Sequence, residues 1–117
     1  MLHDLRIAAA TLEDHKAVDL VILDLRGLSD ATDYFVLASG TSDTHVRALT
    51  EHVIEALRKT GRRAHHSEGV KAGRWALLDY VEFVVHVFHP TLREFYQLER
   101  LWVDAPSLPV AAERGTN

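Results

Sequence analysis

The sequence predicts a single α/β (α+β) domain in which helices flank one mixed sheet of five strands. The chain has 117 residues, a length typical of one domain, and 47% of them are apolar, which is enough to fill a core. Amphipathic helical patterns alternate with β-branched runs in the order helix, strand, strand, helix, strand, strand, strand, helix. Because helices in such an order cover a sheet, we expect residues 1–105 to form the domain and residues 106–117 to form a flexible tail.

The first half of the chain is expected to form two helices and two strands. Apolar residues at three- and four-residue steps predict a helix over residues 2–15, and short apolar runs predict buried strands over residues 18–25 and 33–39. Residues 41–43 are of types that favour helix N-caps. A second helix is therefore expected to run from this turn to Gly61, which supplies the left-handed conformation that commonly closes a helix.

The second half is expected to form three strands and a helix. A short strand over residues 63–66 is followed by a glycine-bearing loop and by two strands, residues 74–80 and 83–88, which lie close enough in sequence to form a hairpin. Pro90 ends the last strand because proline cannot donate a hydrogen bond to the sheet. A capping-box pattern then predicts a helix over residues 91–101.

The hairpin sorts its side chains onto two faces if residues 81–82 form its turn. That register places Trp75 opposite Phe88 and Leu77 opposite His86. One face is almost wholly apolar and consists of Ala76, Leu78, Tyr80, Phe83, Val85 and Val87. The other face mixes large aromatic side chains with an acid and an imidazole, and consists of Trp75, Leu77, Asp79, Val84, His86 and Phe88.

The mixed face has two interpretations. Its composition is typical of an interface whose apolar centre is flanked by polar anchors. It is equally compatible with a second core, because sheets in α/β domains are often covered on both sides and can enclose a buried histidine. The exposure of Trp75 and Phe88 distinguishes the two interpretations, since exposed aromatic side chains on one patch mark a partner site.

Composition excludes several kinds of protein. The sequence contains no cysteine, which excludes disulfides, thiolate zinc sites and cysteine nucleophiles. Its apolar runs are far shorter than the ~20 residues of a membrane span, and no signal-peptide pattern is seen, so we expect a cytoplasmic protein. The net charge of -4 argues against binding driven mainly by nucleic-acid phosphates. Residues 58–74 are locally basic, which fits either a solvated helix end or an edge that lies near RNA.

One candidate ligand site is the turn formed by Gly40, Thr41 and Ser42. It lies between a strand and the N-terminus of a helix, where free backbone N–H groups bind anions, although ordinary helix capping also explains these residues. A small nucleotide-binding transferase that uses this turn is therefore the alternative function. No Asp-x-Asp pair is present to hold magnesium, and the eight histidines lack the spacing of a metal site. We therefore expect no catalytic residue, no metal and no cofactor.

Several blocks of the sequence occur in the order and spacing of a known family across about residues 5–105. The blocks are Lys16-Ala17-x-Asp19-Leu20, Asp33-Tyr34-Phe35-Val36, Ser39-Gly40-Thr41-Ser42, Glu68-Gly69, Trp75-x-Leu77-Leu78-Asp79-Tyr80, Val85-His86-Val87-Phe88 and Arg93-x-Phe95-Tyr96-x-Leu98-Glu99-x-Leu101-Trp102. Together they closely resemble the ribosomal silencing factor family, RsfS, also called Iojap-like. Val81-Glu82 departs from the Gly-Asp of many members, which bears on the type of the hairpin turn but not on the strand faces.

The resemblance implies a fold similar to that of nucleotidyltransferases, without their catalytic carboxylates and without enzymatic activity. It also implies a translational repressor that binds the free large ribosomal subunit through large-subunit ribosomal protein fourteen. Bound there, such a protein sterically prevents the small subunit from joining, chiefly when nutrients are limiting. The lack of a transit-peptide pattern favours a bacterial, cytoplasmic member.

The mixed hairpin face is where we expect the ribosomal protein to bind. The expected contact residues are Trp75, Leu77, Asp79, His86, Phe88 and Glu68. Their apolar side chains would form the centre of the interface, while the carboxylates would pair with arginine or lysine of a basic partner and the imidazole would help to fix orientation. The basic segment allows peripheral contact with ribosomal RNA. The same apolar face also allows two free copies to pair.

Overall fold

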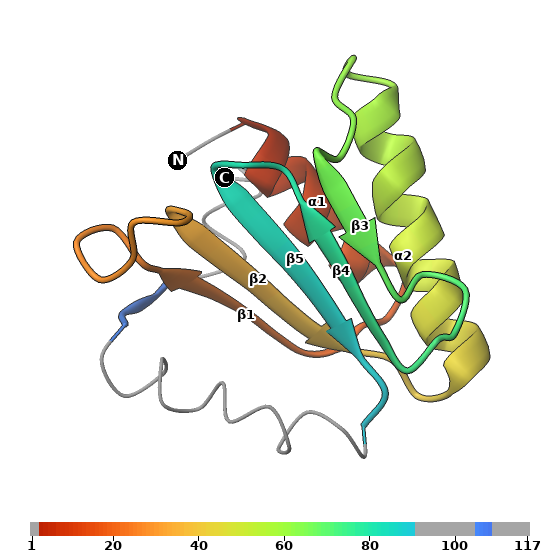
Figure 1. The fold of residues 1–117 in the computed structure, drawn as a ribbon. Helices are drawn as coiled ribbons and strands as arrows, with labels where there is room; N and C mark the ends of the chain where they lie inside the picture. The colour runs from red at the N-terminus through yellow and green to blue at the C-terminus, as the bar shows by residue number, and fades with distance from the viewer. Residues whose placement is uncertain (1–2, 91–104, 109–117) are drawn as a thin grey trace.

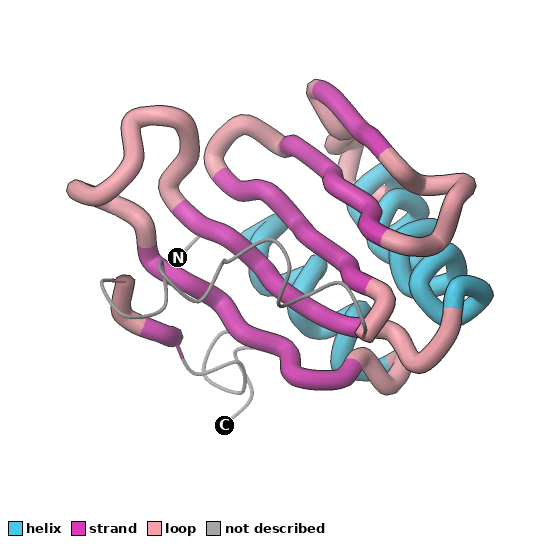
Figure 2. The backbone as a smooth tube through the Cα atoms, turned by 60° about the horizontal axis from the view of Figure 1, so that its bottom comes forward, coloured by secondary structure: helices cyan, strands magenta, loops and turns pink. Residues whose placement is uncertain are grey.

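A computed structural model of the chain describes residues 3–90 and 105–108. In this part of the chain, two helices pack on one face of one mixed sheet of six strands, in the order β3-β4-β5-β2-β1-β6 (Figures 1 and 2). The elements are α1 (His3–Asp14), β1 (Val18–Asp24), β2 (Tyr34–Ser39), α2 (Asp43–Arg58), β3 (His66–Glu68), β4 (Trp75–Asp79), β5 (Phe83–Phe88) and β6 (Ser107–Leu108). The predicted α+β class is thus confirmed, with one strand more than expected.

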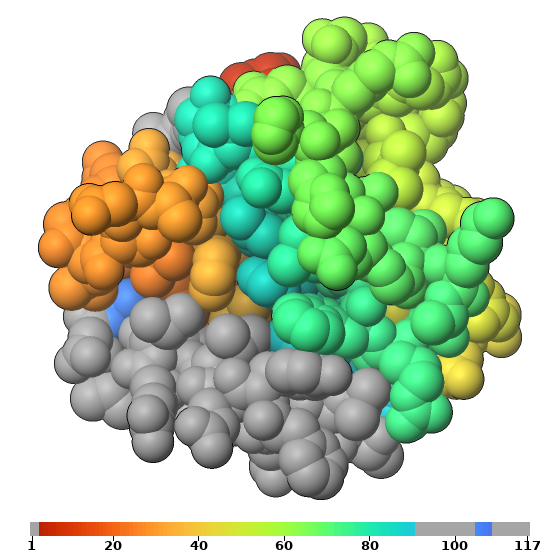
Figure 3. Space-filling view, viewed as in Figure 1, coloured from red at the N-terminus to blue at the C-terminus, as the bar shows by residue number. Residues whose placement is uncertain are grey.

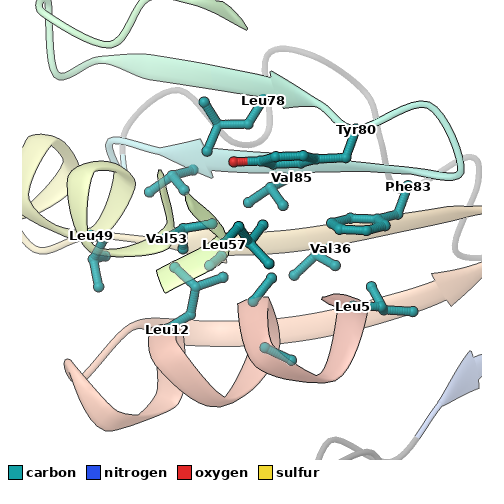
Figure 4. Close-up of a cluster of buried hydrophobic side chains, with 14 of the residues drawn as sticks. Leu5, Leu12, Val36, Leu49, Val53, Leu57, Leu78, Tyr80, Phe83 and Val85 are labelled. Carbon is teal, nitrogen blue, oxygen red and sulfur yellow. The ribbon is translucent and has the colours of Figure 1, made fainter. Parts of the chain in front are cut away.

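The main core lies between the sheet and the two helices (Figure 4). The apolar stripes of both helices are fully buried against it, as their three- and four-residue spacing predicts. The labelled side chains that meet there are Leu5, Leu12, Val36, Leu49, Val53, Leu57, Leu78, Tyr80, Phe83 and Val85. Because full burial of one such aliphatic side chain is worth about 1.5–3 kcal/mol, this layer fixes the sheet on its helices.

The ends of α2 follow from the residues that flank it. Ser42 is the N-cap, and its hydroxyl accepts a hydrogen bond from the backbone N–H of His45 at 3.1 Å. At the other end Gly61 has φ +85°, and its N–H donates to the carbonyl oxygen of Arg58 at 2.9 Å. The glycine therefore takes the left-handed conformation that the sequence predicts for it.

The hairpin of β4 and β5 has the predicted register. Trp75 pairs with Phe88 and Leu77 pairs with His86, and the turn consists of residues 81–82. The apolar face of the hairpin packs under the helices, as expected. At the turn, Val81 has φ +77°, a left-handed conformation that is rare for a β-branched residue. The departure from the Gly-Asp pattern therefore changes the strain in the turn and leaves the strand faces unchanged.

A parallel pair joins the two halves of the sheet. β2 runs parallel to β5, so that Tyr34 pairs with Phe83 and Ser39 pairs with Phe88. β1 lies antiparallel to β2 on one side, and β4 lies antiparallel to β5 on the other. β2 and β5 are therefore the central strands, and side chains on their outer face are shielded by strands on both sides.

Two strands differ from the expectation. β3 begins at His66 rather than at residue 63, because the following Gly69 lies against the backbone of Trp75 and draws the pairing toward the end of the segment. β6 lies in the segment expected to be a tail: Ser107 pairs with Leu23, and the backbone of β1 supplies its hydrogen-bonding partners. The predicted helix over residues 91–101 lies outside the described residues, as do residues 109–117.

Candidate functional site

Three rings form the centre of the mixed hairpin face. The rings of Trp75, His86 and Phe88 are nearly parallel, with interplanar angles of 7–13° and centroids 5.8–5.9 Å apart. Their alternation along β4 and β5 places all three on the face away from the helices, which Figure 3 views. The structure therefore brings together the aromatic residues that the sequence predicts for the site.

The outer part of this face is exposed and hollowed. Trp75 and Leu77 are half-buried, and together with Glu68 and Gly69 they line a pocket of about 170 Å³. Gly69 forms one wall with its backbone, since a Cβ atom on it would lie 1.9 Å from the carbonyl oxygen of Trp75. The pocket thus joins an aromatic ring, an aliphatic side chain and a carboxylate, a combination that suits the long apolar stem and charged end of lysine or arginine.

The inner part of the face is a second core, which corrects the expectation for two residues. Phe88 is 0% exposed and His86 is 4% exposed, so neither is accessible at the surface. Phe88 belongs to a cluster of buried side chains that includes Leu37 of β2 and Leu23 of β1. This burial follows from the place of β5 at the centre of the sheet. The core interpretation therefore applies to the residues of β5, whereas the half-buried Trp75 leaves the binding interpretation as a prediction.

His86 is neutral in this environment. Burial lowers the pKa of its imidazole to about 4, because the charged form loses hydration. The indole Nε1–H of Trp75 donates a hydrogen bond to Nδ1 of His86 at 3.2 Å. Phe35 meets the same imidazole edge to face, with ring centroids 4.6 Å apart. Sequence reasoning placed Phe35 in a family block but did not connect it with the site, because the parallel pairing of β2 with β5 is not visible in the hairpin pattern.

The two candidate carboxylates occupy different settings. Glu68 is exposed, and its Oε2 lies 2.9 Å from Nε2 of His66. Asp79 is half-buried at the far end of β4, where its Oδ1 accepts a hydrogen bond from the backbone N–H of Val81 at 2.8 Å. Glu68 therefore belongs to the pocket, whereas Asp79 also stabilises the hairpin turn.

The turn of Gly40, Thr41 and Ser42 uses its polar groups internally. The N–H of Gly40 donates to the carbonyl oxygen of Phe88, and the N–H of Thr41 donates to Nδ1 of His45, each at 2.9 Å. The hydroxyl of Ser42 caps α2. Gly40 is required for packing, since a Cβ atom there would lie 2.8 Å from Val46. The capping interpretation thus accounts for this turn, and the N–H groups of Gly40 and Thr41 are not available to an anion.

The basic segment does not form one patch. Residues 58–63 lie at the C-terminal end of α2, whereas Gly73 packs against Asp43 in the first turn of that helix. Since α2 has 16 residues and is about 24 Å long, the basic residues fall into two groups at its opposite ends. Arg62 is further tied to Asp4 and Glu82. Lys59 and Arg63 are exposed at and just after the C-terminal end of α2.

Among residues 3–90 and 105–108, no group of three or more histidine and acidic side chains is arranged to hold a metal ion. No helix in the same residues is long and apolar enough to cross a membrane.

Comparison with known proteins identifies the family. A model of the family described as ribosomal silencing factor during starvation matches residues 2–117. The chain is 41% identical over 102 residues to ribosomal silencing factor RsfS of Bacillus subtilis, covering 87% of this chain and 86% of that protein. A mouse protein named mitochondrial assembly of ribosomal large subunit protein 1 is 30% identical over 102 residues, which cover 85% of this chain and 45% of that protein.

The fold points to the same family. The crystal structure of a Chromobacterium violaceum protein superposes with a TM-score of 0.80 at 35% sequence identity, covering 85% of this chain and 82% of that chain. Sequence match and fold therefore agree over most of the chain. The chain belongs to the ribosomal silencing factor family, RsfS or Iojap.

Proposed function

We propose that this protein represses translation by binding the free large ribosomal subunit through large-subunit ribosomal protein fourteen. Bound there, it sterically prevents the small subunit from joining, chiefly when nutrients are limiting. The protein acts in the cytoplasm as a binding partner rather than as an enzyme. The observation that carries the proposal is the half-exposed pocket of Trp75, Leu77, Gly69 and Glu68, on a chain of the silencing-factor family.

The chemistry of the pocket suits a basic protein partner. Trp75 and Leu77 supply an apolar wall, and Glu68 supplies a carboxylate at the rim, so a lysine or arginine side chain can bury its stem and keep its charge paired. Asp79 lies further along the same strand as a second anionic anchor. The net charge of -4 favours approach to a basic surface. His86 and Phe88 support this surface from beneath.

Two weaker contacts accompany the main one. The exposed Lys59 and Arg63 allow peripheral contact with ribosomal RNA at the end of α2. The half-buried Trp75 also allows two free copies to pair through the same face, in competition with the ribosome. Analytical ultracentrifugation checks the pairing, and a Trp75→Ala variant should shift any dimer toward monomer.

Co-sedimentation with isolated ribosomal subunits tests the proposal. The protein should travel with the large subunit and not with the small one, and its addition should reduce the association of the two. Leu77→Ala should weaken this binding, whereas Leu28→Ala should not, because Leu28 is 52% exposed on the loop between β1 and β2. Trp75→Ala should cost about 2 kcal/mol of binding. A protein that stays at the top of the gradient at low salt would contradict the proposal.

A further inference from the structure

His86 is an unusual residue for its position. All six residues of β5 are buried, and the other five are Phe83, Val84, Val85, Val87 and Phe88. A leucine or valine would fill a buried position in a sheet without leaving a polar group away from water. Packing alone therefore does not explain why a histidine occupies this position.

The two ring nitrogens of His86 differ in their hydrogen bonding. Nδ1 of His86 accepts the indole N–H of Trp75, so the neutral ring must carry its own proton on Nε2. That Nε2 is buried and has no hydrogen-bonding partner among the residues that the structure describes. Leaving a donor buried and unpaired opposes folding. The buried Nε2–H therefore destabilises the fold, while Nδ1 on the other side of the ring accepts the hydrogen bond from Trp75.

The ring of His86 is fixed on several sides. Phe35 packs against it edge to face at an interplanar angle of 67°, and Phe88 lies nearly parallel to it at 7°. Because these neighbours hold the imidazole in place, the lone pair of Nδ1 points in one fixed direction. The indole that it binds is therefore held in one orientation too, with an angle of 13° between the rings of Trp75 and His86.

We propose that His86 is a positioning residue for the partner site, whose Nδ1 holds the indole of Trp75 as the preformed aromatic wall of the pocket. This inference rests on the proposed function, in which Trp75 is the anchor for the ribosomal protein. An anchor that is already ordered loses less conformational entropy on binding, so the hydrogen bond raises affinity without any contact between His86 and the partner. The Nε2–H, unpaired within the described part of the chain, is then the cost of placing an acceptor at the edge of the indole.

A double-mutant cycle on affinity for the isolated large subunit tests the coupling. His86→Leu removes the acceptor and should weaken binding about fivefold, the value of one neutral hydrogen bond. Trp75→Phe removes the N–H and keeps an aromatic ring. In that background His86→Leu should have no further effect, because the bond is already lost. Equal losses in both backgrounds would overturn the inference and assign His86 to packing alone.

Rescue separates the acceptor from the shape of the ring. His86→Asn places an amide oxygen near the position of Nδ1 and should retain most of the affinity, whereas His86→Gln places it near Nε2 and should behave like His86→Leu. Urea unfolding of each variant checks that the fold persists under the binding conditions. If the asparagine and leucine variants bind equally, the hydrogen bond plays no part and the inference fails.

A fluorescence measurement keeps the inference separate from the proposed function. The sequence has two tryptophans, so Trp102→Phe leaves Trp75 as the single reporter. In this background His86→Leu should increase quenching of Trp75 by iodide and lower its anisotropy, and His86→Asn should restore both. If the wild-type protein does not bind the large subunit, the proposed function fails while quenching still reports the role of His86. If the protein binds but quenching is unchanged in His86→Leu, the positioning role fails alone.

Discussion

The guanidinium group of Arg62 lies 3.1 Å from the carboxylate of Asp4, and this ion pair joins the loop after α2 to the first turn of α1. The same guanidinium donates to the carbonyl oxygen of Tyr80 and forms an ion pair with Glu82 at the hairpin turn. One half-buried side chain therefore connects both helical segments to the strands that carry the proposed site.

Replacement of Arg62 should test this connection. Arg62→Met keeps much of the aliphatic stem and removes every donor, so we expect the free energy of unfolding to fall by about 2–3 kcal/mol. Urea unfolding measures the change. Arg58→Met is the matched control, because Arg58 pairs with Glu55 on an exposed surface and its loss should change the free energy of unfolding far less. Similar losses in the two variants would contradict a special role for Arg62.

The hairpin turn should be improved by a single substitution. Val81 is 53% exposed and has φ +77°, so it makes little apolar contact and occupies a conformation that costs a β-branched residue energy. Val81→Gly should therefore stabilise the protein by about 0.5–1 kcal/mol after the greater entropy of an unfolded glycine is subtracted. Thermal unfolding checks the sign. Val18→Gly, at an exposed valine of β1 without a positive φ, should destabilise instead.

Stability should depend on His86 in mild acid. Its pKa is about 4 in the fold, below the ordinary value of 6.5, so the unfolded chain binds the extra proton first as the pH falls. The stabilising effect of the neutral imidazole is therefore complete above pH 6.5 and is lost progressively between pH 6.5 and about 4, to a total of about 3 kcal/mol. The same pKa predicts no change in the charge of His86 between about pH 6 and pH 8.

Urea unfolding at several pH values measures this dependence. The difference between wild type and His86→Leu isolates the contribution of this residue from that of other titrating groups. The leucine variant should lose less stability between pH 7 and pH 4.5. Parallel curves for the two proteins would show that His86 keeps an ordinary pKa.

The wall of the pocket should be sensitive to one methyl group. Gly69 and Gly27 both have positive φ, of +71° and +86°, but only Gly69 would bring a Cβ atom against the backbone of Trp75. Gly27→Ala should cost about 1 kcal/mol of stability from backbone strain alone. Gly69→Ala should cost about 1–3 kcal/mol more and should weaken binding to the large subunit, because β3 and β4 must separate. Equal effects on unfolding and unchanged binding would remove Gly69 from the site.

Much of the hairpin could be predicted from sequence. Alternation of apolar and polar side chains has a period of two, and a short turn at residues 81–82 leaves one register that buries Tyr80 and Phe83 on the same side. Local pattern and local turn thus suffice for the register and the faces.

The exposure of that face could not be predicted in the same way. Phe88 belongs to a buried cluster with Leu37 and Leu23, which come from strands far away in sequence, and the alternation within β5 does not indicate them. The short β6 has two residues and no pattern of its own. The N–H of Thr41 looked free for an anion because its partner is the imidazole of His45, whose rotamer depends on the packed helix. Tertiary contacts decide each of these points.

The parallel pairing of β2 with β5 also sets when the partner surface comes into existence. Each hairpin joins strands that are neighbours along the chain, whereas the pairing of Tyr34 with Phe83 closes a long loop and carries a larger entropic cost. The contact between Phe35 and His86 lies on this ladder. A growing chain therefore has no completed aromatic wall until β5 has left the ribosome that makes it and has docked on β2.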